Sequence, residues 1–321
     1  MKNYQDISQS IYQEIKTANN ILLISHKKPD GDTLGSNLAL VNLLKKKKKN
    51  ITSFCADPIP ENLQFLPNSH IMTDDHKMFI EKYDLVITLD CSNLEYAGVD
   101  GLITALPLGY RFINIDHHVS NPGYADINLV IHEASSTAEV LYRLFIDWDI
   151  EWDEDIANSL SCGLVTDTNG FKNPATNYLA LSAASDLINK GANVYKTIQA
   201  TVNQNNVGDL RLWGRALERL HKVDHYNLIY TWMTIQDFEE CQVDASAAEG
   251  IANFLHILKE GKIILVLREG QDNTVKGSLR TTSNVDLTKL AGLFGGGGHK
   301  KASGFSLPGK LVYDKNNLKV I

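Results

Sequence analysis

Residues 20–44 read NILLISHKKPDGDTLGSNLALVNLL, and this stretch decides the class of the fold. The apolar run Ile21–Ile24 predicts a buried strand that ends at His26. The turn Pro29-Asp30-Gly31 follows, and residues 32–44 then carry a helical pattern. A buried strand that leads through a short polar loop into a helix is the unit from which parallel, helix-covered sheets are built.

The same alternation of strands and helices continues through the first half of the chain. Apolar runs predict strands at residues 51–55, 84–89 and 111–115. Apolar residues that recur every three or four positions predict helices. These helices are one near the start of the chain, marked by Ile7, Ile11 and Ile15, and others at residues 137–145, 155–165, 174–190 and 193–202.

A polar stretch at residues 203–206 predicts a break between two domains. A helix at 210–220 and strands at 228–234, 262–267 and 274–281 then indicate a second unit. We therefore predict an α/β protein whose parallel, helix-covered sheet is joined by a helical linker to a smaller α+β C-terminal domain. The predicted boundaries are residues 1–190 for the first domain, 191–222 for the linker and 223–321 for the second domain.

Length and composition limit the class of protein. The 321 residues suit two domains, and 43% hydrophobic content is ordinary for globular cores. There is no run of 18 apolar residues and no apolar segment within Met1–Ser10, so we expect neither a membrane span nor a secretory signal, and a cytoplasmic location. The four scattered cysteines form no CxxC pair and predict neither a disulfide framework nor a zinc site.

The net charge of −7 is unevenly distributed. Residues 259–321 hold 11 Lys/Arg against 5 Asp/Glu, and the rest of the chain is acidic. Because the chain lacks a broadly basic surface, we expect no long duplex nucleic acid as a partner. A basic C-terminal part beside an acidic body suits a small anionic substrate, although a solvated basic face would give the same balance. The run Lys45–Lys49 indicates either a nucleic-acid patch or, more simply, the dipole-favoured end of a helix.

Acidic residues and histidines follow three of the predicted strands. In an open α/β sheet the loops that leave neighbouring strands converge at one edge, where ligands bind. Carboxylates and imidazoles without thiolates suit Mn²⁺, Mg²⁺ or Co²⁺, and two such ions can activate water and clamp a phosphoryl centre. Asp90 stands alone at its strand end and is the natural bridge between two ions. The three groups are His26, Asp30 and Asp32, then Asp90, then Asp116, His117 and His118.

The C-terminal part carries a second signal. Gly295–Gly298 and His299 follow a predicted helix at residues 286–294, and consecutive glycines let backbone N–H groups approach an anion. A flexible linker is the alternative. Strand periodicity places Lys276, Ser278 and Arg280 on one face of the preceding strand, where they form either a phosphate-binding row or a solvated edge.

These residues resemble the motifs of the DHH phosphoesterase superfamily. HKKPDGDTLGS at 26–36, LDCS at 89–92, the triplet Asp116-His117-His118 and VTDTNGF at 165–171 are similar to its four N-terminal motifs. GSLRTTS at 277–283 and FGGGGHKKASGF at 294–305 resemble its associated C-terminal domain. Length and domain order resemble the nanoRNase and pAp phosphatase branch. One departure is Asn169 where Gly is common, and Asn tolerates a left-handed backbone.

The resemblance implies a role for each motif residue. It implies that Asp116 orients a histidine, that His118 contacts the substrate phosphate or protonates the leaving oxygen, and that Lys276, Ser278, Arg280, Gly296, Gly297, Gly298 and His299 bind the far end of a nucleotide. One ion would be held by His26, Asp30 and Asp90, and the other by Asp32, Asp90, His117 and Asp167.

We therefore expect hydrolysis of short oligoribonucleotides, linear dinucleotides such as pApA, or 3′-phosphoadenosine 5′-phosphate (pAp), with two divalent ions, most simply Mn²⁺. The alternatives are a RecJ-like single-strand exonuclease, a manganese pyrophosphatase-like hydrolase and a non-catalytic nucleotide-binding module. We expect no membrane partner. A homodimer, the cleavage polarity and the physiological nucleotide are left open.

Overall fold

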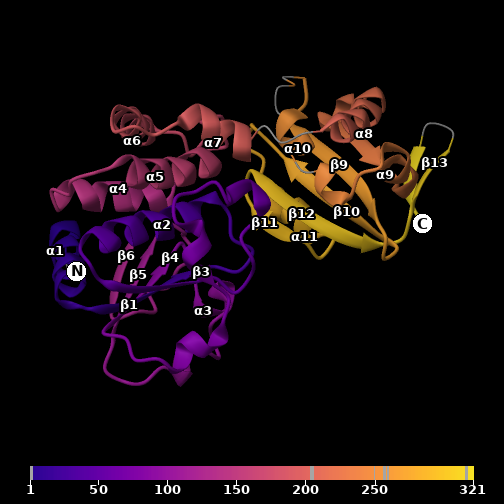
Figure 1. Cartoon of the computed structure of the whole chain (residues 1–321). Coiled ribbons are helices and arrows are strands. Elements are labelled where there is room, and N and C mark those ends of the chain that lie inside the picture. Colours follow the sequence, from indigo (N-terminus) through magenta and orange to yellow (C-terminus); the bar gives the residue numbers. More distant parts are fainter. Residues whose placement is uncertain (1–2, 203–205, 249, 256–257, 259, 315–316) are drawn as a thin grey trace. The chain divides into compact units, whose positions relative to one another are not determined.

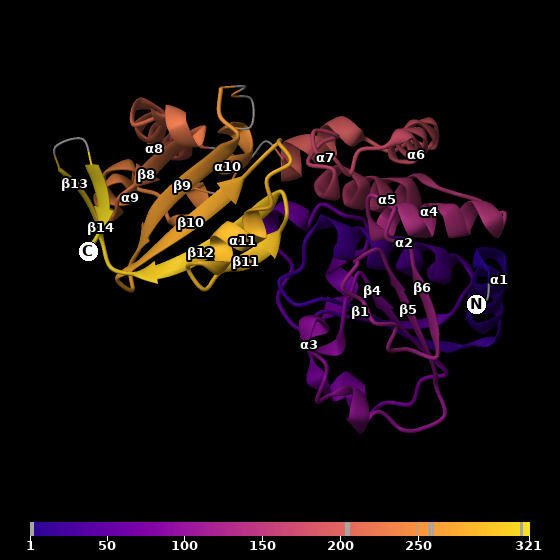
Figure 2. The same cartoon turned by 180° about the vertical axis from the view of Figure 1, so that it is seen from behind.

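The computed structural model describes residues 3–202, 206–248, 250–255, 258, 260–314 and 317–321. The chain divides into two compact units, Met1–Gln204 and Asn205–Ile321, each with its own sheet (Figures 1 and 2). The predicted break at 203–206 falls almost wholly outside the described residues. Helix α7 of the predicted linker belongs to the first unit and helix α8 to the second.

The first unit contains a six-stranded sheet in which every pair of neighbours is parallel. The strand order is β3-β2-β1-β4-β5-β6. The chain thus builds the sheet from β1 toward one edge, and then returns to the other side of β1 and continues from β4 toward the opposite edge. The point between β1 and β4 is therefore the switch point at which ligands bind in open α/β sheets. The strands are β1 (Asn20–Ser25), β2 (Asn50–Phe54), β3 (Met72–Thr73), β4 (Leu85–Leu89), β5 (Arg111–Asp116) and β6 (Ile127–Val130).

Both faces of this sheet are buried, which explains why the strands are continuously apolar. Ile21 and Leu23 belong to the core beneath the long helices, whereas Leu22 and Ile24 pack on the opposite face with Phe79. The helices of the unit are α1 (Tyr4–Thr17), α2 (Gly31–Lys46), α3 (Leu94–Ala97), α4 (Thr137–Asp147), α5 (Glu154–Asp167), α6 (Tyr178–Asn189) and α7 (Val194–Thr201), with 3₁₀ turns at Glu61–Leu63, Ser69–Ile71, His76–Ile80 and Ile103–Ala105.

Helices α2 and α5 cross at unusually close range because two glycines face each other. A Cβ atom on Gly35 would lie 2.4 Å from the Ser159 carbonyl oxygen, and one on Gly163 would lie 2.4 Å from Asp32 Oδ1. No side chain fits at either position. The C-terminal end of α5 is thereby brought beside the N-terminal end of α2, at the edge of the sheet where the motifs lie.

Several predicted boundaries were wrong. Helix α5 does not end at Val165 but continues to Asp167, so Asp167 is helical. Helix α6 begins at Tyr178 and not near Pro174, because the Asn177 side chain accepts a hydrogen bond from the Ala180 amide and caps the helix there. Strand β6, at Ile127–Val130, was not predicted.

The lysine run is engaged within the first unit. Helix α2 ends at Lys46, whose amino group lies 2.7 Å from an Asp153 carboxylate oxygen. Lys49 Nζ donates to the carbonyl oxygens of Lys16 and Ala18, and Lys45 Nζ donates to Asn68. These contacts support the helix-end interpretation of the run.

The second unit contains a mixed sheet in the order β11-β12-β10-β9-β8-β7, in which only the β8–β9 pair is parallel. Its helical elements are α8 (Val207–Glu218), α9 (Ile235–Cys241), α10 (Ile251–Phe254) and α11 (Leu287–Gly292), with 3₁₀ turns at Asp224–Tyr226 and Ala245–Ala248. The strands are β7 (His221–Val223), β8 (Leu228–Met233), β9 (Ile263–Gly270), β10 (Thr274–Arg280), β11 (Gly297–His299) and β12 (Ala302–Pro308), beside a separate hairpin of β13 (Leu311–Asp314) and β14 (Asn317–Val320).

The fold class is as predicted: a parallel, helix-covered sheet followed by a separate mixed α+β unit. Among the described residues, no helix is both long and apolar enough to cross a membrane.

Candidate metal centre

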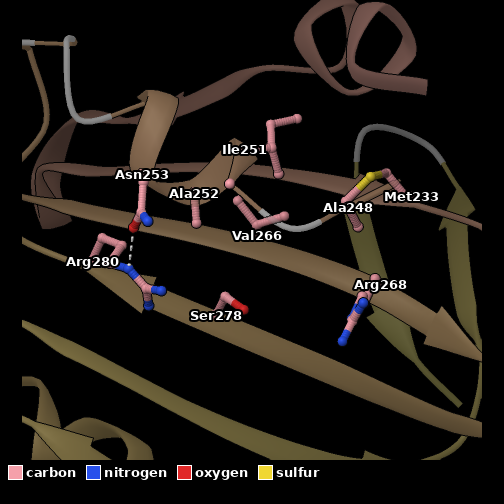
Figure 3. A pocket seen from close by; sticks show the side chains of 10 residues that line it. Met233, Ala248, Ile251, Ala252, Asn253, Val266, Arg268, Ser278 and Arg280 are labelled. Carbon is pink, nitrogen blue, oxygen red and sulfur yellow. Dashed lines mark hydrogen bonds between the residues drawn. The ribbon is translucent and has the colours of Figure 1, made fainter. Parts of the chain in front are cut away.

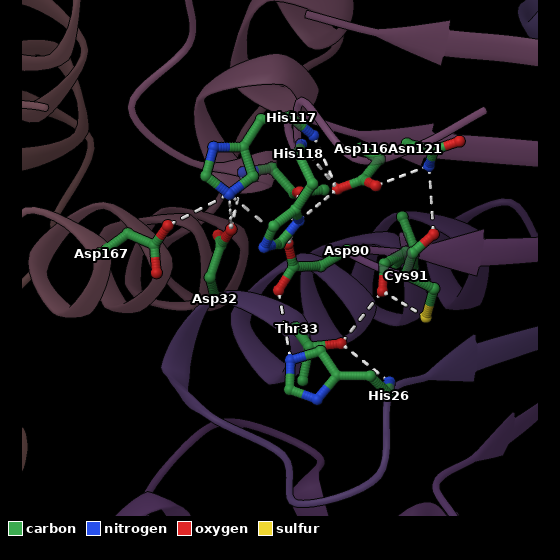
Figure 4. A network of polar contacts seen from close by, with 12 residues as sticks. His26, Asp32, Thr33, Asp90, Cys91, Asp116, His117, His118, Asn121 and Asp167 are labelled. Atoms are coloured by element: carbon green, nitrogen blue, oxygen red, sulfur yellow. Dashed lines mark hydrogen bonds and ion pairs between the residues drawn. The ribbon is translucent and has the colours of Figure 1, made fainter. Parts of the chain in front are cut away.

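Asp90 lies at the carboxyl end of β4 in a left-handed backbone conformation, with φ of +60°. Such a conformation is uncommon for a residue other than glycine and is concentrated at functional sites. Its two carboxylate oxygens face different histidines: Oδ2 lies 3.4 Å from His26 Nε2, and Oδ1 lies 3.7 Å from His117 Nε2 (Figure 4). The carboxylate therefore stands between two groups of candidate ligands.

The first group contains His26, Asp30 and Asp90. The Nδ1 atom of His26 lies 2.8 Å from the Lys27 carbonyl oxygen, which leaves the Nε2 lone pair to point into the group. That Nε2 atom is buried, lies 3.6 Å from Asp30 Oδ1, and has no well-formed hydrogen bond with any described residue. A buried nitrogen that lacks a hydrogen-bond partner is expected where that atom binds a metal ion.

The second group contains Asp32, His117 and Asp167, beside Asp90. His117 Nε2 lies 3.2 Å from Asp167 Oδ2 and 4.0 Å from Asp32 Oδ2. Asp32 is fully buried, and its two oxygens accept hydrogen bonds of 2.6 and 2.9 Å from the Thr137 and Ala138 amides at the start of α4. The positive end of the helix therefore holds the carboxylate in place, although burial and the neighbouring carboxylates of Asp90 and Asp167 raise the pKa of Asp32 well above its usual range.

The spacing of these atoms suits metal ions. Bonds of about 2.1 Å from one ion to two ligands at right angles place those ligand atoms about 3 Å apart. The nitrogen–oxygen separations of 3.2 to 4.0 Å in the cluster need only small closing movements. Oxygen and imidazole ligands without thiolates suit Mn²⁺, Mg²⁺ or Co²⁺.

The electrostatics of the cluster also favour positive charge at this site. Burial would lower the pKa of His26, but its contacts with Asp30 and Asp90 raise it to about 10. Burial likewise opposes protonation of His117, yet Asp167 and the neighbouring carboxylates raise the pKa of that imidazole to about 10. Burial raises the pKa of Asp90 to about 6. The cluster therefore collects protons that divalent ions would displace.

Asp116 differs from the other carboxylates because both of its oxygens are already occupied. Its Oδ1 accepts from the His117 amide at 2.7 Å and lies 2.8 Å from His118 Nδ1, while its Oδ2 accepts from the Asn121 amide group at 2.6 Å. Burial opposes its ionisation, but the bonds from His118 and Asn121 keep the pKa of Asp116 below the usual range. His118 Nδ1 also lies 3.4 Å from Asp90 Oδ1, but its shorter contact is with Asp116. We therefore assign His118 to Asp116, not to an ion.

Two contacts of the cluster were not anticipated from the motifs. The Thr137 hydroxyl donates to Asp90 Oδ1 at 2.9 Å, although the sequence pattern indicated only a helix start there. The Tyr96 ring lies 4.7 Å from the His26 ring and is 39% exposed beside the cluster. Nothing in the local sequence marks either residue, because each reaches the cluster only through the fold.

The turn after Asp167 survives the departure at Asn169. Asn169 has φ of +50° and Gly170 has φ of +64°, so Asn adopts the left-handed conformation that the turn requires. Its amide donates to the Thr166 carbonyl oxygen at 3.0 Å. The substitution therefore leaves Asp167 beside His117.

In the second unit, the predicted row on β10 is present. Val275, Gly277 and Leu279 are buried, whereas Lys276, Ser278 and Arg280 face the other side. Ser278 and Arg280 line a cavity of about 310 Å³ that also contains Arg268 and Asn253 (Figure 3). Arg280 Nε donates to Asn253 Oδ1 at 2.8 Å. Lys276 does not line this cavity.

The glycine segment is partly explained by packing. A Cβ atom on Gly296 would lie 2.1 Å from the Gly304 carbonyl oxygen, and Gly298 has φ of +136° with Ala302 and Ser303 close by. Both glycines therefore let β11 approach β12, so the segment is an edge strand and not the open loop that we expected. A Cβ atom on Gly297 would meet nothing within 4 Å among the described residues. The side chain of His299 lies outside the described part of the chain.

Comparison with known proteins agrees with this geometry. Residues 20–164 match the DHH family, N-terminal domain, and residues 225–319 match the DHHA1 domain. The chain therefore carries a DHH N-terminal domain and a DHHA1 domain. The match confirms the resemblance drawn from the motifs, and with it the prediction of a phosphoesterase. DHH phosphoesterases are metal-dependent, in keeping with the buried cluster.

Proteins similar to this chain match it over almost its whole length. The bifunctional oligoribonuclease and PAP phosphatase NrnA of Thermus thermophilus is 28% identical over 90% of this chain and 84% of its own length. The protein of the same name from Bacillus subtilis is 23% identical over 92% of each chain. The crystal structure of an exopolyphosphatase-related protein from Bacteroides fragilis superposes with a TM-score of 0.85 and 26% identity, over 97% of this chain and 94% of that one.

Proposed function

We propose that this DHH protein hydrolyses phosphoester bonds in short nucleotides: oligoribonucleotides of a few residues, linear dinucleotides such as pApA, and pAp. We propose two divalent ions, most simply Mn²⁺. One is held by His26, Asp30 and Asp90, and the other by Asp32, Asp90, His117 and Asp167. Ions held by these residues would supply the charge that stabilises a phosphoryl centre and activates water.

One observation carries the proposal. The two oxygens of Asp90 face two separate His and Asp groups, and a single ion cannot use both sides of this arrangement. Asp90 is 2% exposed, and Thr137 and its own strained backbone hold it in place. A buried carboxylate so oriented is suited to bridge two ions about 3.5–4 Å apart.

We propose roles for two residues that do not bind the ions, His118 and Asp116. His118 is more exposed than His117 and has its Nδ1 against Asp116, which leaves Nε2 to contact the substrate phosphate or to protonate the leaving oxygen. Asp116 fixes the imidazole orientation, as carboxylates do for catalytic histidines. The DHH domain, which we place at residues 1–190, would thus perform the reaction.

We assign the far end of the nucleotide to the second domain, residues 223–321. Arg280 and Ser278 line a cavity of about 310 Å³ with Arg268, and guanidinium groups are well suited to phosphate. The relatives from Thermus thermophilus and Bacillus subtilis are named oligoribonuclease and PAP phosphatase, which supports a short nucleotide as the substrate. Gly297, where a Cβ atom would meet nothing within 4 Å among the described residues, and His299 are further candidates for this contact.

A substrate panel tests the proposal. The purified protein is incubated with Mn²⁺ and with pAp, pApA, a long single-stranded RNA and pyrophosphate, and the products are separated by chromatography. We expect rapid turnover of pAp or pApA, slow turnover of the long strand, and no activity after exhaustive chelation. Equal rates on long and short strands would favour the RecJ-like alternative, turnover of pyrophosphate alone would favour a pyrophosphatase, and binding without turnover would favour a non-catalytic module.

A further inference from the structure

Asn121 lies in the loop that follows the triplet Asp116-His117-His118, and its side chain turns back toward Asp116. Its amide nitrogen lies 2.6 Å from Asp116 Oδ2, 2.7 Å from Asn114 Oδ1 and 3.2 Å from the Cys91 carbonyl oxygen (Figure 4). Its own Oδ1 accepts from the Gly123 amide at 2.9 Å. That last contact identifies which end of the amide is nitrogen.

The contact with Asp116 has a specific consequence. Asp116 is fully buried, and its Oδ1 accepts from three donors in the triplet: two backbone amides and His118 Nδ1. Among the described residues, Asn121 alone donates a hydrogen bond to Oδ2. It therefore fixes the rotation of the carboxylate plane, and the plane sets the direction in which His118 is held.

Asn121 is itself anchored to the neighbouring strand end. The Asn114 amide nitrogen donates to Thr88 Oγ1 at 3.0 Å, and the Tyr124 hydroxyl lies 2.8 Å from the Cys91 carbonyl oxygen. Thr88 and Cys91 flank Asp90 at the end of β4. The buried polar chain thus connects the strand end that carries Asp90 to the one that carries Asp116, and such connected networks are rigid when every member is satisfied.

We propose that Asn121 is a positioning residue of the reaction, which acts on substrate only through Asp116 and His118. This inference rests on the proposed function. It assigns a role outside the metal ligands and outside the four motifs quoted from the sequence. If it is correct, Asn121 contributes to turnover without contributing to metal binding.

A purely local role must be distinguished, because Asn121 also closes its own loop through the Gly123 amide. Replacement of Asn121 by Asp retains an oxygen acceptor for that amide but removes the donor to Asp116. The matched control is Asn128, which closes the same loop through the Ala125 amide and carbonyl at 3.0 and 2.7 Å and has no contact with Asp116. Asn128→Ala therefore perturbs the loop alone.

A double-mutant cycle tests the inference. We measure kcat and KM on pApA or another turned-over short nucleotide for wild type, Asn121→Ala, Asn121→Asp, His118→Ala, the double variant Asn121→Ala with His118→Ala, and Asn128→Ala. Loss of an outer partner typically costs about 10- to 100-fold in activity, so we expect that fall in kcat for Asn121→Ala and Asn121→Asp, with KM little changed. In the His118→Ala background, Asn121→Ala should change the rate by no more than about twofold. Mn²⁺ binding by calorimetry should match wild type.

Other results would overturn the inference. Additive losses in the double variant, wild-type activity of Asn121→Asp, or an equal loss in Asn128→Ala would each show that Asn121 does not act through His118. Loss of Mn²⁺ binding in Asn121→Asp would make it a support of the metal centre instead. A wild type inactive on every phosphoester would overturn the proposed function and this inference with it, whereas an active wild type with additive losses overturns the inference alone.

Discussion

Arg280→Ala should separate substrate binding from the chemical step. The Arg280 guanidinium uses Nε to hold Asn253 and one Nη1 bond to hold the Leu279 carbonyl oxygen, which leaves further N–H donors directed at the cavity. Burial lowers the pKa of Arg280 from its ordinary very high value, but the group stays charged at neutral pH. The side chain is therefore a partly desolvated cation that has no carboxylate partner among the described residues.

The size of the effect follows from that environment. A hydrogen bond to a charged group contributes about 1.5–3 kcal/mol, which corresponds to a loss of one to two orders of magnitude in kcat/KM for pAp or pApA. A small chromogenic phosphodiester has no second phosphate for Arg280 to bind, so its hydrolysis should stay close to that of wild type. Remote binding groups of this kind help to place the scissile phosphate.

The assay compares both substrates for wild type, Arg280→Ala and Arg211→Ala. Arg211 is exposed on α8 in the same unit and forms no side-chain hydrogen bond or ion pair with any described residue, so its replacement controls for the loss of one positive charge. Thermal melting of each variant checks that the Asn253 contact is not needed for folding. Equal losses on the two substrates would refute the reasoning, because Arg280 would then act on the chemistry or on the fold.

Four further predictions concern the metal centre and the helices that support it. Asp90→Ala should abolish turnover of every substrate and lower the bound metal, measured by elemental analysis; retention of both metal and activity would contradict it. Neighbouring carboxylates raise the pKa of His26 and of His117 to about 10, so protons compete with metal below that pH. The apparent Mn²⁺ affinity should therefore rise from about pH 6 to about pH 9, by up to roughly tenfold per pH unit for each displaced proton. A flat pH profile in calorimetry would count against ligation by these imidazoles. By the same shifts, the stability that these imidazoles give to the metal-free protein is fully present below about pH 6.5 and is lost as the pH rises through about 10. Gly163→Ala would place a methyl group 2.4 Å from Asp32 Oδ1. It should lower the free energy of unfolding by about 1–3 kcal/mol, measured by thermal unfolding, and should also weaken metal binding. Gly101→Ala, where nothing lies within 4 Å of the added atom, should change either quantity little.

The strands and the metal cluster were largely predictable from sequence, for a physical reason. Both faces of the sheet are buried, so runs such as Ile21–Ile24 are continuously apolar and stand out in the chain. His26 and Asp90 then appear as polar residues directly after such runs. The parallel arrangement brings those strand ends together without any further information.

What could not be predicted depends on contacts between distant segments. Thr137 reaches Asp90, and Asn121 reaches Asn114 and the Cys91 carbonyl, only after the sheet has formed. The extension of α5 beyond Val165 to Asp167 and the pairing of Gly297 with Gly304 likewise depend on neighbours that no local pattern reveals. Periodicity therefore identified the elements, but not the residues that connect them.

The central claim is that Asp90 bridges two ions, and anomalous diffraction from crystals grown with Mn²⁺ tests it most directly. The account predicts two anomalous peaks about 3.5–4 Å apart, with one Asp90 oxygen on each, one peak beside His26 and the other beside His117. A single peak, or two peaks with Asp90 bound to only one of them, would contradict it.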